Sequence, residues 1–213
     1  MSIASEEEPK RRRASVRRAA VSVQSAEADA PPARADERPF IIGIGASAGG
    51  LEALSLLLPG LPKNLGLSYV VVQHLSPTYR SMMSQLLGRE TTMPVRDIED
   101  GMSPEPNTVY ITPPNRNLTL LSGHFRLVEP ARESMPKPSV NRFFASLAEE
   151  IGESTIGIVL SGTGSDGASG IHAIKAAGGF TFAQDPDTAK YSGMPQSAID
   201  TGSVDWILPP ENM

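Results

Sequence analysis

Short apolar runs alternate with amphipathic segments from residue 39 to the end of the chain. Runs rich in β-branched residues are typical of strands buried on both faces of a parallel sheet, and apolar residues at helical spacing predict helices between them. The predicted strands are residues 40–44, 67–72, 155–160, 180–183 and 204–208, and the predicted helices are 51–58, 78–89, 140–151, 168–177 and one beginning near 194. This alternation predicts an α/β fold with a doubly wound, mostly parallel sheet and helices on both faces.

The middle of the chain has a different pattern. Three short apolar segments, residues 109–111, 118–120 and 125–128, surround a Pro-Pro pair and a turn that contains Gly123. Short strands separated by turn residues are typical of hairpins. We therefore expect an antiparallel hairpin inserted into the parallel fold.

The first 38 residues differ from the rest in composition. They contain three consecutive glutamates, the basic run 10–13 and an Ala/Pro-rich acidic stretch, with almost nothing that a core could bury. We predict a disordered charged tail over residues 1–38, followed by one domain over 39–213. The basic run is interpreted either as a contact for nucleic acid, membrane or an acidic partner, or as a solvated segment whose charges nearly balance.

Charge and composition narrow the classes of function. The net charge of −5 gives no support for nucleic-acid binding by the folded part. The absence of cysteine excludes disulfides, thiolate metal sites and a cysteine nucleophile. No apolar run approaches the roughly 18 residues that span a bilayer, and the start lacks a signal-peptide profile, so we expect a cytoplasmic protein without membrane insertion.

Three chemically complementary side chains follow three of the predicted strands. Ser47 comes after the first strand, His74 after the second and Asp166 after the third. Because ligands of open parallel sheets bind beyond the carboxyl ends of the strands, we expect these residues to meet at one edge. A serine, a histidine and an acid are the three parts of a nucleophilic triad.

The chemistry of each of the three residue types suits its role in such a triad. A serine hydroxyl is a poor nucleophile at neutral pH and needs a base, and an imidazole accepts that proton and later returns it to a leaving group. A carboxylate on the other ring nitrogen fixes the tautomer. The pattern Gly45-x-Ser47-x-Gly49 also has the form of a nucleophile elbow, a tight turn between a strand and a helix.

Other interpretations remain open at this point. Ser47 or Asp166 would also serve as a helix N-cap, and His74 as a polar residue at a strand end. Gly43-x-Gly45-x-x-Ala48 matches a dinucleotide-binding fingerprint, although no carboxylate follows the second strand to hold a ribose.

The two remaining histidines are weaker candidates for a catalytic or metal-binding role. His124 falls in the predicted hairpin turn and His172 inside a predicted helix. No two histidines have metal-ligand spacing, so we expect neither a metal nor another cofactor.

Residues 39–213 resemble the catalytic domain of CheB, the chemotaxis protein-glutamate methylesterase. The motifs that carry the resemblance are Gly45-Ala46-Ser47-Ala48-Gly49-Gly50, Val72-Gln73-His74, Pro138-Ser139-Val140, Leu160-Ser161-Gly162-Thr163-Gly164-Ser165-Asp166-Gly167-Ala168 and Gly193-Met194-Pro195. In that family the serine, histidine and aspartate of these motifs form the triad, which implies Ser47, His74 and Asp166 here.

The resemblance implies hydrolysis of γ-glutamyl methyl esters on the cytoplasmic helices of chemoreceptors, and glutamine deamidation as a further activity. Peptide N–H groups around Ala48 and the turn Thr163-Gly164 are the expected oxyanion donors. A catalytically weak sensory module of a hybrid signalling protein is the alternative.

The sequence also departs from the family pattern. No receiver domain precedes the catalytic region in this sequence, which looks more like hybrids in which the esterase is followed by a CheR-type methyltransferase. Residues 209–213 would then be a linker to that module. Asn141 stands where an acid is expected, and Pro114-Asn115 replaces a Pro-Gly turn, which puts substrate fit in doubt more than chemistry.

Overall fold

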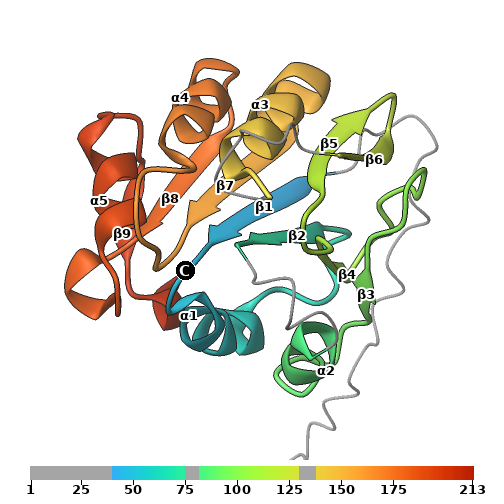
Figure 1. The fold of residues 1–213 in the computed structure, drawn as a ribbon, viewed down its shortest axis with the longest axis horizontal. Coiled ribbons are helices and arrows are strands. Elements are labelled where there is room, and N and C mark those ends of the chain that lie inside the picture. Colours follow the sequence, from blue (N-terminus) through green and yellow to red (C-terminus); the bar gives the residue numbers. More distant parts are fainter. Residues whose placement is uncertain (1–39, 75–81, 130–137) are drawn as a thin grey trace, which may run out of the picture. The chain divides into compact units, whose positions relative to one another are not determined.

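Seven parallel strands form the central sheet of the computed structural model, which describes residues 40–74, 82–129 and 138–213. Their order across the sheet is β3-β4-β2-β1-β7-β8-β9 (Figure 1). The strands are β1 (Ile41–Ala46), β2 (Ser68–Gln73), β3 (Val95–Asp97), β4 (Thr108–Ile111), β7 (Thr155–Val159), β8 (Phe180–Gln184) and β9 (Trp206–Leu208). The prediction of a doubly wound, mostly parallel α/β sheet is confirmed.

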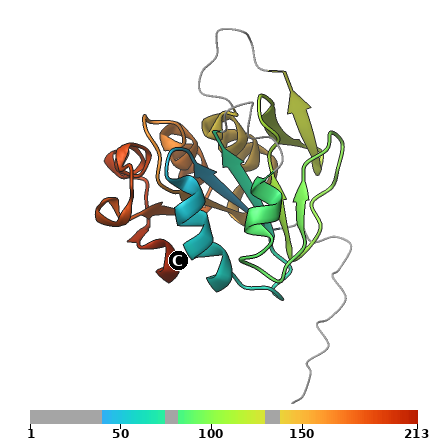
Figure 2. The same cartoon turned by 60° about the horizontal axis from the view of Figure 1, so that its bottom comes forward.

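Helices cover both faces of this sheet (Figures 1 and 2). On one face lie α1 (Gly50–Leu57), α2 (Met83–Leu87) and the 3-10 turns η1 (Leu58–Gly60) and η5 (Pro210–Asn212). On the other lie α3 (Val140–Ile151), α4 (Ala168–Ala176) and α5 (Gly193–Asp200). Two further 3-10 turns, η3 (Gly152–Ser154) and η4 (Pro186–Thr188), connect elements. Each face has its own apolar cluster, because alternate residues of a strand point to opposite faces.

Strand β1 lies at the centre, between β2 and β7. The chain builds outward from β1 on one side through β2 and β4, then crosses to build the other side from β7. Such a reversal of strand order opens a crevice at the carboxyl ends of the strands. The three strands that precede Ser47, His74 and Asp166 are therefore adjacent in space.

The middle of the chain corrects one prediction. An antiparallel pair is present, formed by β5 (Asn117–Leu121) and β6 (His124–Val128). However, residues 109–111 belong to β4, a fully buried parallel strand of the main sheet, and not to the hairpin. The neighbouring edge strand β3 was not predicted, because its sequence Val95-Arg96-Asp97 is short and mostly polar.

Glycines in β1 allow helix α3 to lie directly against the sheet. A Cβ built on Gly45 would lie 2.4 Å from Val140 Cγ1, and one on Gly43 would lie 2.8 Å from Phe144. Contacts this short are incompatible with a side chain. The glycine spacing that matched a dinucleotide fingerprint is thus explained by helix packing.

Three predicted segments lie at element ends or reach outside the described residues. The helix predicted over 78–89 is observed as α2 and ends before Gly88, whereas residues 75–81 lie outside the described residues. The predicted tail 1–38 also lies outside them. The segment interpreted as a linker contains η5, in which Pro210 is buried against the domain. No helix in the described ranges is long and apolar enough to cross a membrane.

Candidate active site

Ser47 occupies the tight turn between β1 and α1. Strand β1 ends at Ala46, and the N-cap of α1 is Gly49, whose φ of 75° lies in the left-handed region that favours glycine. A Cβ on Gly49 would also lie 2.6 Å from Ser161 Oγ. Ser47 makes no side-chain cap to α1, so its interpretation as a helix cap is wrong.

The side chains of Ser47, His74 and Asp166 form one continuous chain of hydrogen bonds. Ser47 Oγ lies 3.1 Å from His74 Nδ1, and His74 Nε2 lies 2.8 Å from Asp166 Oδ2. A carboxylate only accepts, so Nε2 carries the proton and Nδ1 offers its lone pair to the Ser47 hydroxyl. The imidazole is in the tautomer that a general base requires.

Asp166 is held by the N-terminus of helix α3. Its carboxylate accepts hydrogen bonds from Val140 N at 2.7 Å, Asn141 N at 3.0 Å and Ser139 Oγ at 3.3 Å. The N-cap of α4 is Gly167, so the interpretation of Asp166 as the cap of that helix is wrong. The unpaired N–H groups at the start of a helix favour a negative charge there.

This environment keeps Asp166 ionised. Burial alone would raise the pKa of its carboxyl, because the charged form loses its hydration. The hydrogen bond from His74 and the backbone N–H groups of Asn141 and Val140 outweigh burial, so the pKa lies below its ordinary value. An ionised Asp166 is suited to stabilise a protonated imidazole.

Asn141 joins the two helices that surround Asp166. Its backbone N–H binds Asp166, and its side-chain Oδ1 accepts from Gly167 N and Gly170 N, each at 2.9 Å. The expected acid is therefore replaced by a neutral acceptor that satisfies the N-terminus of α4. Sequence reasoning missed this role, although Ser139 before the apolar helix 140–151 was a signal for a helix N-terminus at this place.

Neighbouring strands hold the first two peptide groups of the nucleophile turn. Ala46 O accepts from His74 N at 3.1 Å, and Ser47 N donates to Ser161 O at 3.0 Å. Ser47 O accepts from Gly50 N at 2.9 Å. The backbone at Ser47 is therefore fixed from both adjacent strand ends.

This arrangement sets the direction of the N–H groups of Ala48 and Gly49. The carbonyl of Ser47 is bound within the turn and that of Ala48 accepts from Ser161 Oγ at 2.9 Å. The N–H and C=O of a trans peptide point in opposite directions. The N–H of Ala48 therefore points away from the Ser47 carbonyl, and the N–H of Gly49 points away from the Ala48 carbonyl. Neither donates to any acceptor among the described residues.

The loop that contains Thr163 and Gly164 runs beside Ser47. A Cβ built on Gly162 would lie 2.9 Å from Ser47 Cβ, so only a glycine lets the loop approach this closely. Thr163 and Gly164 are exposed, and their N–H groups likewise have no acceptor among the described residues. The loop that holds the expected donors of Thr163 and Gly164 therefore packs against Ser47 at Gly162.

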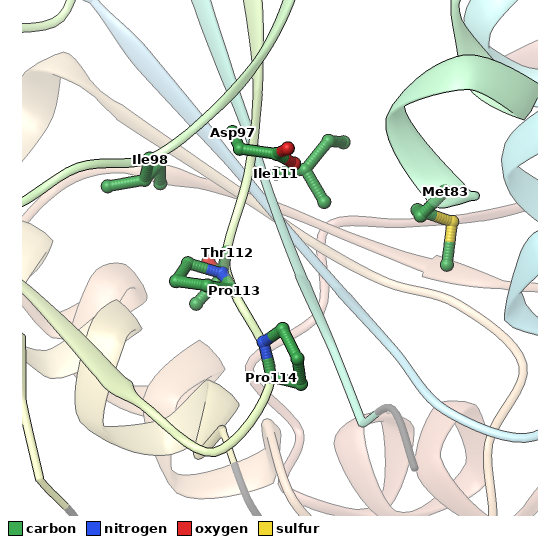
Figure 3. Close-up of a pocket in the computed structure, with 7 residues that line it drawn as sticks. All are labelled: Met83, Asp97, Ile98, Ile111, Thr112, Pro113 and Pro114. Carbon is green, nitrogen blue, oxygen red and sulfur yellow. The ribbon is translucent and has the colours of Figure 1, made fainter. Parts of the chain in front are cut away.

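One cavity lies elsewhere on the same edge of the sheet (Figure 3). Its lining consists of Met83, Asp97, Ile98, Ile111, Thr112, Pro113 and Pro114, from α2 and the ends of β3 and β4. None of the three hydrogen-bonded side chains lines it. We therefore assign it no part in the candidate chemistry.

The other two histidines lie apart from this site. His124 is exposed and its Nδ1 lies 2.7 Å from Ser122 O, while His172 Nδ1 lies 3.0 Å from Ser203 Oγ. Within the described ranges no group of three or more His, Asp and Glu side chains is arranged to hold a metal ion.

A doubly wound parallel sheet with a serine, a histidine and an acid at the carboxyl ends of three adjacent strands is the arrangement found in α/β serine hydrolases. A family model described as CheB methylesterase matches residues 42–213, and the chain belongs to that family.

Proteins of known name and a solved structure are similar to this chain. The chain is 39% identical over 181 residues to "Protein-glutamate methylesterase/protein-glutamine glutaminase 2" of Anaeromyxobacter dehalogenans (strain 2CP-C), which covers 85% of this chain and 53% of that one. The crystal structure of the Thermotoga maritima CheB methylesterase catalytic domain has a TM-score of 0.77 at 34% identity, covering 82% of this chain and 94% of that one.

A third relative is much longer. An uncharacterized 104.1 kDa protein of Rhodobacter capsulatus is 45% identical over 126 residues, which are 59% of this chain and 13% of that protein. The chain also spans about half the length of the first curated methylesterases that it matches.

Proposed function

We propose that this chain hydrolyses methyl esters of protein glutamate side chains, with Ser47 as nucleophile, His74 as general base and Asp166 as the carboxylate that orients the imidazole. The observation that carries the proposal is the chain of hydrogen bonds from Ser47 Oγ through both ring nitrogens of His74 to Asp166. Membership of the CheB methylesterase family supports the ester as substrate.

The reaction follows from this geometry in two halves. Ser47 Oγ attacks the ester carbonyl carbon while His74 Nδ1 takes the hydroxyl proton. The tetrahedral intermediate collapses, and the proton passes from His74 to the departing methoxy oxygen, which leaves as methanol. Water then attacks the acyl-enzyme with His74 again as base, which releases glutamate and regenerates Ser47.

Asp166 and backbone N–H groups near Ser47 are proposed to stabilise the charges that develop on His74 and on the substrate oxygen. Asp166 stabilises the imidazolium form of His74, for which its lowered pKa suits it. We assign the oxyanion to the N–H of Ala48 together with N–H groups of the Thr163-Gly164 turn. One such donor is typically worth about 3 kcal/mol of transition-state stabilisation.

We propose methylated helices of chemoreceptor cytoplasmic domains as the substrate, and the cytoplasm as the place of action. Relatives are named both methylesterase and protein-glutamine glutaminase, so the same residues are also proposed to deamidate glutamine, with ammonia leaving in place of methanol. No nucleic-acid partner is proposed.

A hybrid arrangement is a further part of the proposal. In the Rhodobacter capsulatus relative the matching segment is a small part of a long chain, which supports a domain that works within larger proteins. We propose a CheR-type methyltransferase module as its neighbour, and the natural sequence beyond Met213 tests this directly.

The decisive experiment is methanol release from methylated receptor by the wild type and by Ser47→Ala. We expect release by the wild type and none above background in the variant, while both bind the receptor. A non-catalytic sensory module would bind receptor without methanol release, and its Ser47 would not react with a serine-directed phosphonate. Methanol release by Ser47→Ala would contradict the assigned nucleophile.

A further inference from the structure

Ser161 is a buried residue that hydrogen-bonds the nucleophile turn, the segment near Tyr191 and, through its N–H, Gln184 Oε1 at 2.8 Å. It follows β7 and only 1% of it is exposed. Its hydroxyl donates to Ala48 O at 2.9 Å and accepts from Tyr191 N at 3.0 Å, and its carbonyl accepts from Ser47 N. Ser161 therefore contacts the peptide groups before and after Ser47 and also the chain near Tyr191.

The peptide between Ala48 and Gly49 is the least restrained part of this turn. Glycine populates backbone conformations of both signs of φ, so the φ of Gly49 opposes a rotation of this peptide less than that of another residue would. The Ala48 carbonyl has one partner among the described residues, which is Ser161 Oγ. The hydroxyl of Ser161 is thus the restraint on the direction of this peptide.

The direction of the peptide decides the electrostatics next to Ser47. In the observed direction the Ala48 carbonyl points to the buried Ser161 and the Gly49 N–H points the opposite way. A reversal would turn the negative end of this peptide dipole to the side on which the Gly49 N–H now lies, next to the peptide whose Ala48 N–H is proposed as an oxyanion donor. Donors aimed at such an oxygen accelerate the reaction only while they are held in place.

We propose that Ser161 is a positioning residue, whose hydroxyl keeps the Ala48 carbonyl turned away from the oxyanion and so preserves the donor geometry beside Ser47. This rests on the proposed function, because the oxyanion exists only if Ser47 is the nucleophile. The hydrogen bonds of the Ser161 hydroxyl are with Ala48 and Tyr191, and not with Ser47 Oγ or His74. It acts through the peptide that it holds.

The same hydroxyl joins the nucleophile turn to the segment before α5. Tyr191 N donates to Ser161 Oγ, and Tyr191 O accepts from Gly162 N at 2.9 Å. An exposed ion pair of Lys190 with Glu52 in α1 also lies here, and it contributes little because water screens it. Removing the Ser161 hydroxyl therefore releases two backbone groups at once, one in each segment.

Ser146 provides a matched control. Its hydroxyl is also buried, donates to Phe143 O at 2.7 Å and accepts from Leu120 N at 3.0 Å. It makes the same two kinds of hydrogen bond as Ser161, but between α3 and β5. Ser146→Ala and Ser161→Ala should both lower stability, because each removes a hydroxyl that bonds one carbonyl and one N–H, although Phe143 O keeps its acceptor role within α3.

The test compares Ser161→Ala, Ser161→Thr and Ser146→Ala with the wild type. For each protein the kcat and KM of methanol release, the rate of Ser47 labelling by a phosphonate, and the thermal unfolding midpoint are measured. We expect Ser161→Ala to lose about 10- to 100-fold in kcat and in labelling rate, with KM nearly unchanged. Ser161→Thr, which keeps a hydroxyl, should recover most of this loss, and Ser146→Ala should keep the wild-type rates.

Two results would overturn the proposal. One is a wild-type labelling rate in Ser161→Ala, and the other is an equal loss of rate in Ser146→Ala. If Ser161→Ala does not fold, Ser161→Cys preserves the size but weakens the hydrogen bonds, and should show the same loss in smaller measure.

The two proposals fail in distinguishable ways. A wild type that is labelled at Ser47 but releases no methanol contradicts the methylesterase, while the labelling rates of the variants still decide the role of Ser161. A wild type that shows neither reaction contradicts both.

Discussion

The carboxylate of Asp166 accepts a 2.7 Å hydrogen bond from the backbone N–H of Val140, the first residue of helix α3, although the two residues lie 26 positions apart. The hydrogen bond brings the positive end of the α3 dipole to the acid of the candidate triad. The acid is therefore oriented by a helix on one side and by His74 on the other. Both its charge and its position follow from this pair of contacts.

Replacing Asp166 with Asn should abolish most activity without unfolding the protein. The amide cannot accept from His74 and the α3 backbone as a carboxylate does, and the imidazole loses the partner that fixes its tautomer. By analogy with serine hydrolases, we expect a loss of about 10⁴-fold in kcat for methanol release. Receptor binding should persist. A loss of less than tenfold would show that Asp166 does not orient the base.

The lowered pKa of Asp166 makes stability depend on pH in a defined direction. Because the folded-state pKa lies below the unfolded-state value of about 3.9, the carboxylate stabilises the fold fully above that value. This contribution is lost as pH falls through the folded-state pKa. Urea unfolding of the wild type and of Asp166→Asn at a series of acid pH values should give stability curves that converge as the pH falls. Parallel curves would contradict the shift.

Burial of Tyr69 predicts how the free energy of unfolding changes at alkaline pH. Burial raises the pKa of its phenol to about 12, and its hydroxyl donates to Pro62 O at 2.6 Å. A raised pKa means that the neutral form stabilises the fold below about pH 10, and that this contribution fades as pH rises toward 12. Tyr69→Phe should lower stability at neutral pH and lose less of it between pH 9 and 11 than the wild type does, as measured by urea unfolding. Equal losses would contradict the prediction.

The convergence of Ser47, His74 and Asp166 could be predicted from the sequence because it depends on a simple rule. Each residue follows a strand with a strong apolar pattern, and the carboxyl ends of adjacent parallel strands meet at one edge. The pattern also predicted helix α3 with its observed bounds, Val140–Ile151.

The supports of the site could not be predicted in the same way. That Val140 and Asn141 bind Asp166 depends on how close α3 lies to β1, which is a matter of packing and not of periodicity. Ser161 gave no local signal either, because its hydroxyl acts across the sheet on Ala48, 113 positions away. The assignment of residues 109–111 to the hairpin failed because a four-residue apolar strand has the same pattern in a hairpin and in a parallel sheet.

The approach of α3 to β1 gives the last prediction, for Gly45→Ala. Its Cβ would lie 2.4 Å from Val140 Cγ1, so the first turn of α3 must move outward and carry the Val140 N–H away from Asp166. We expect a loss of about 1–3 kcal/mol in the free energy of unfolding, as is typical of an overpacked core, together with a fall in kcat. Gly60→Ala is the matched control, because nothing lies within 4 Å of a Cβ there. If Gly45→Ala loses stability but retains full kcat, the position of α3 does not affect the activity of the triad, which would contradict the prediction.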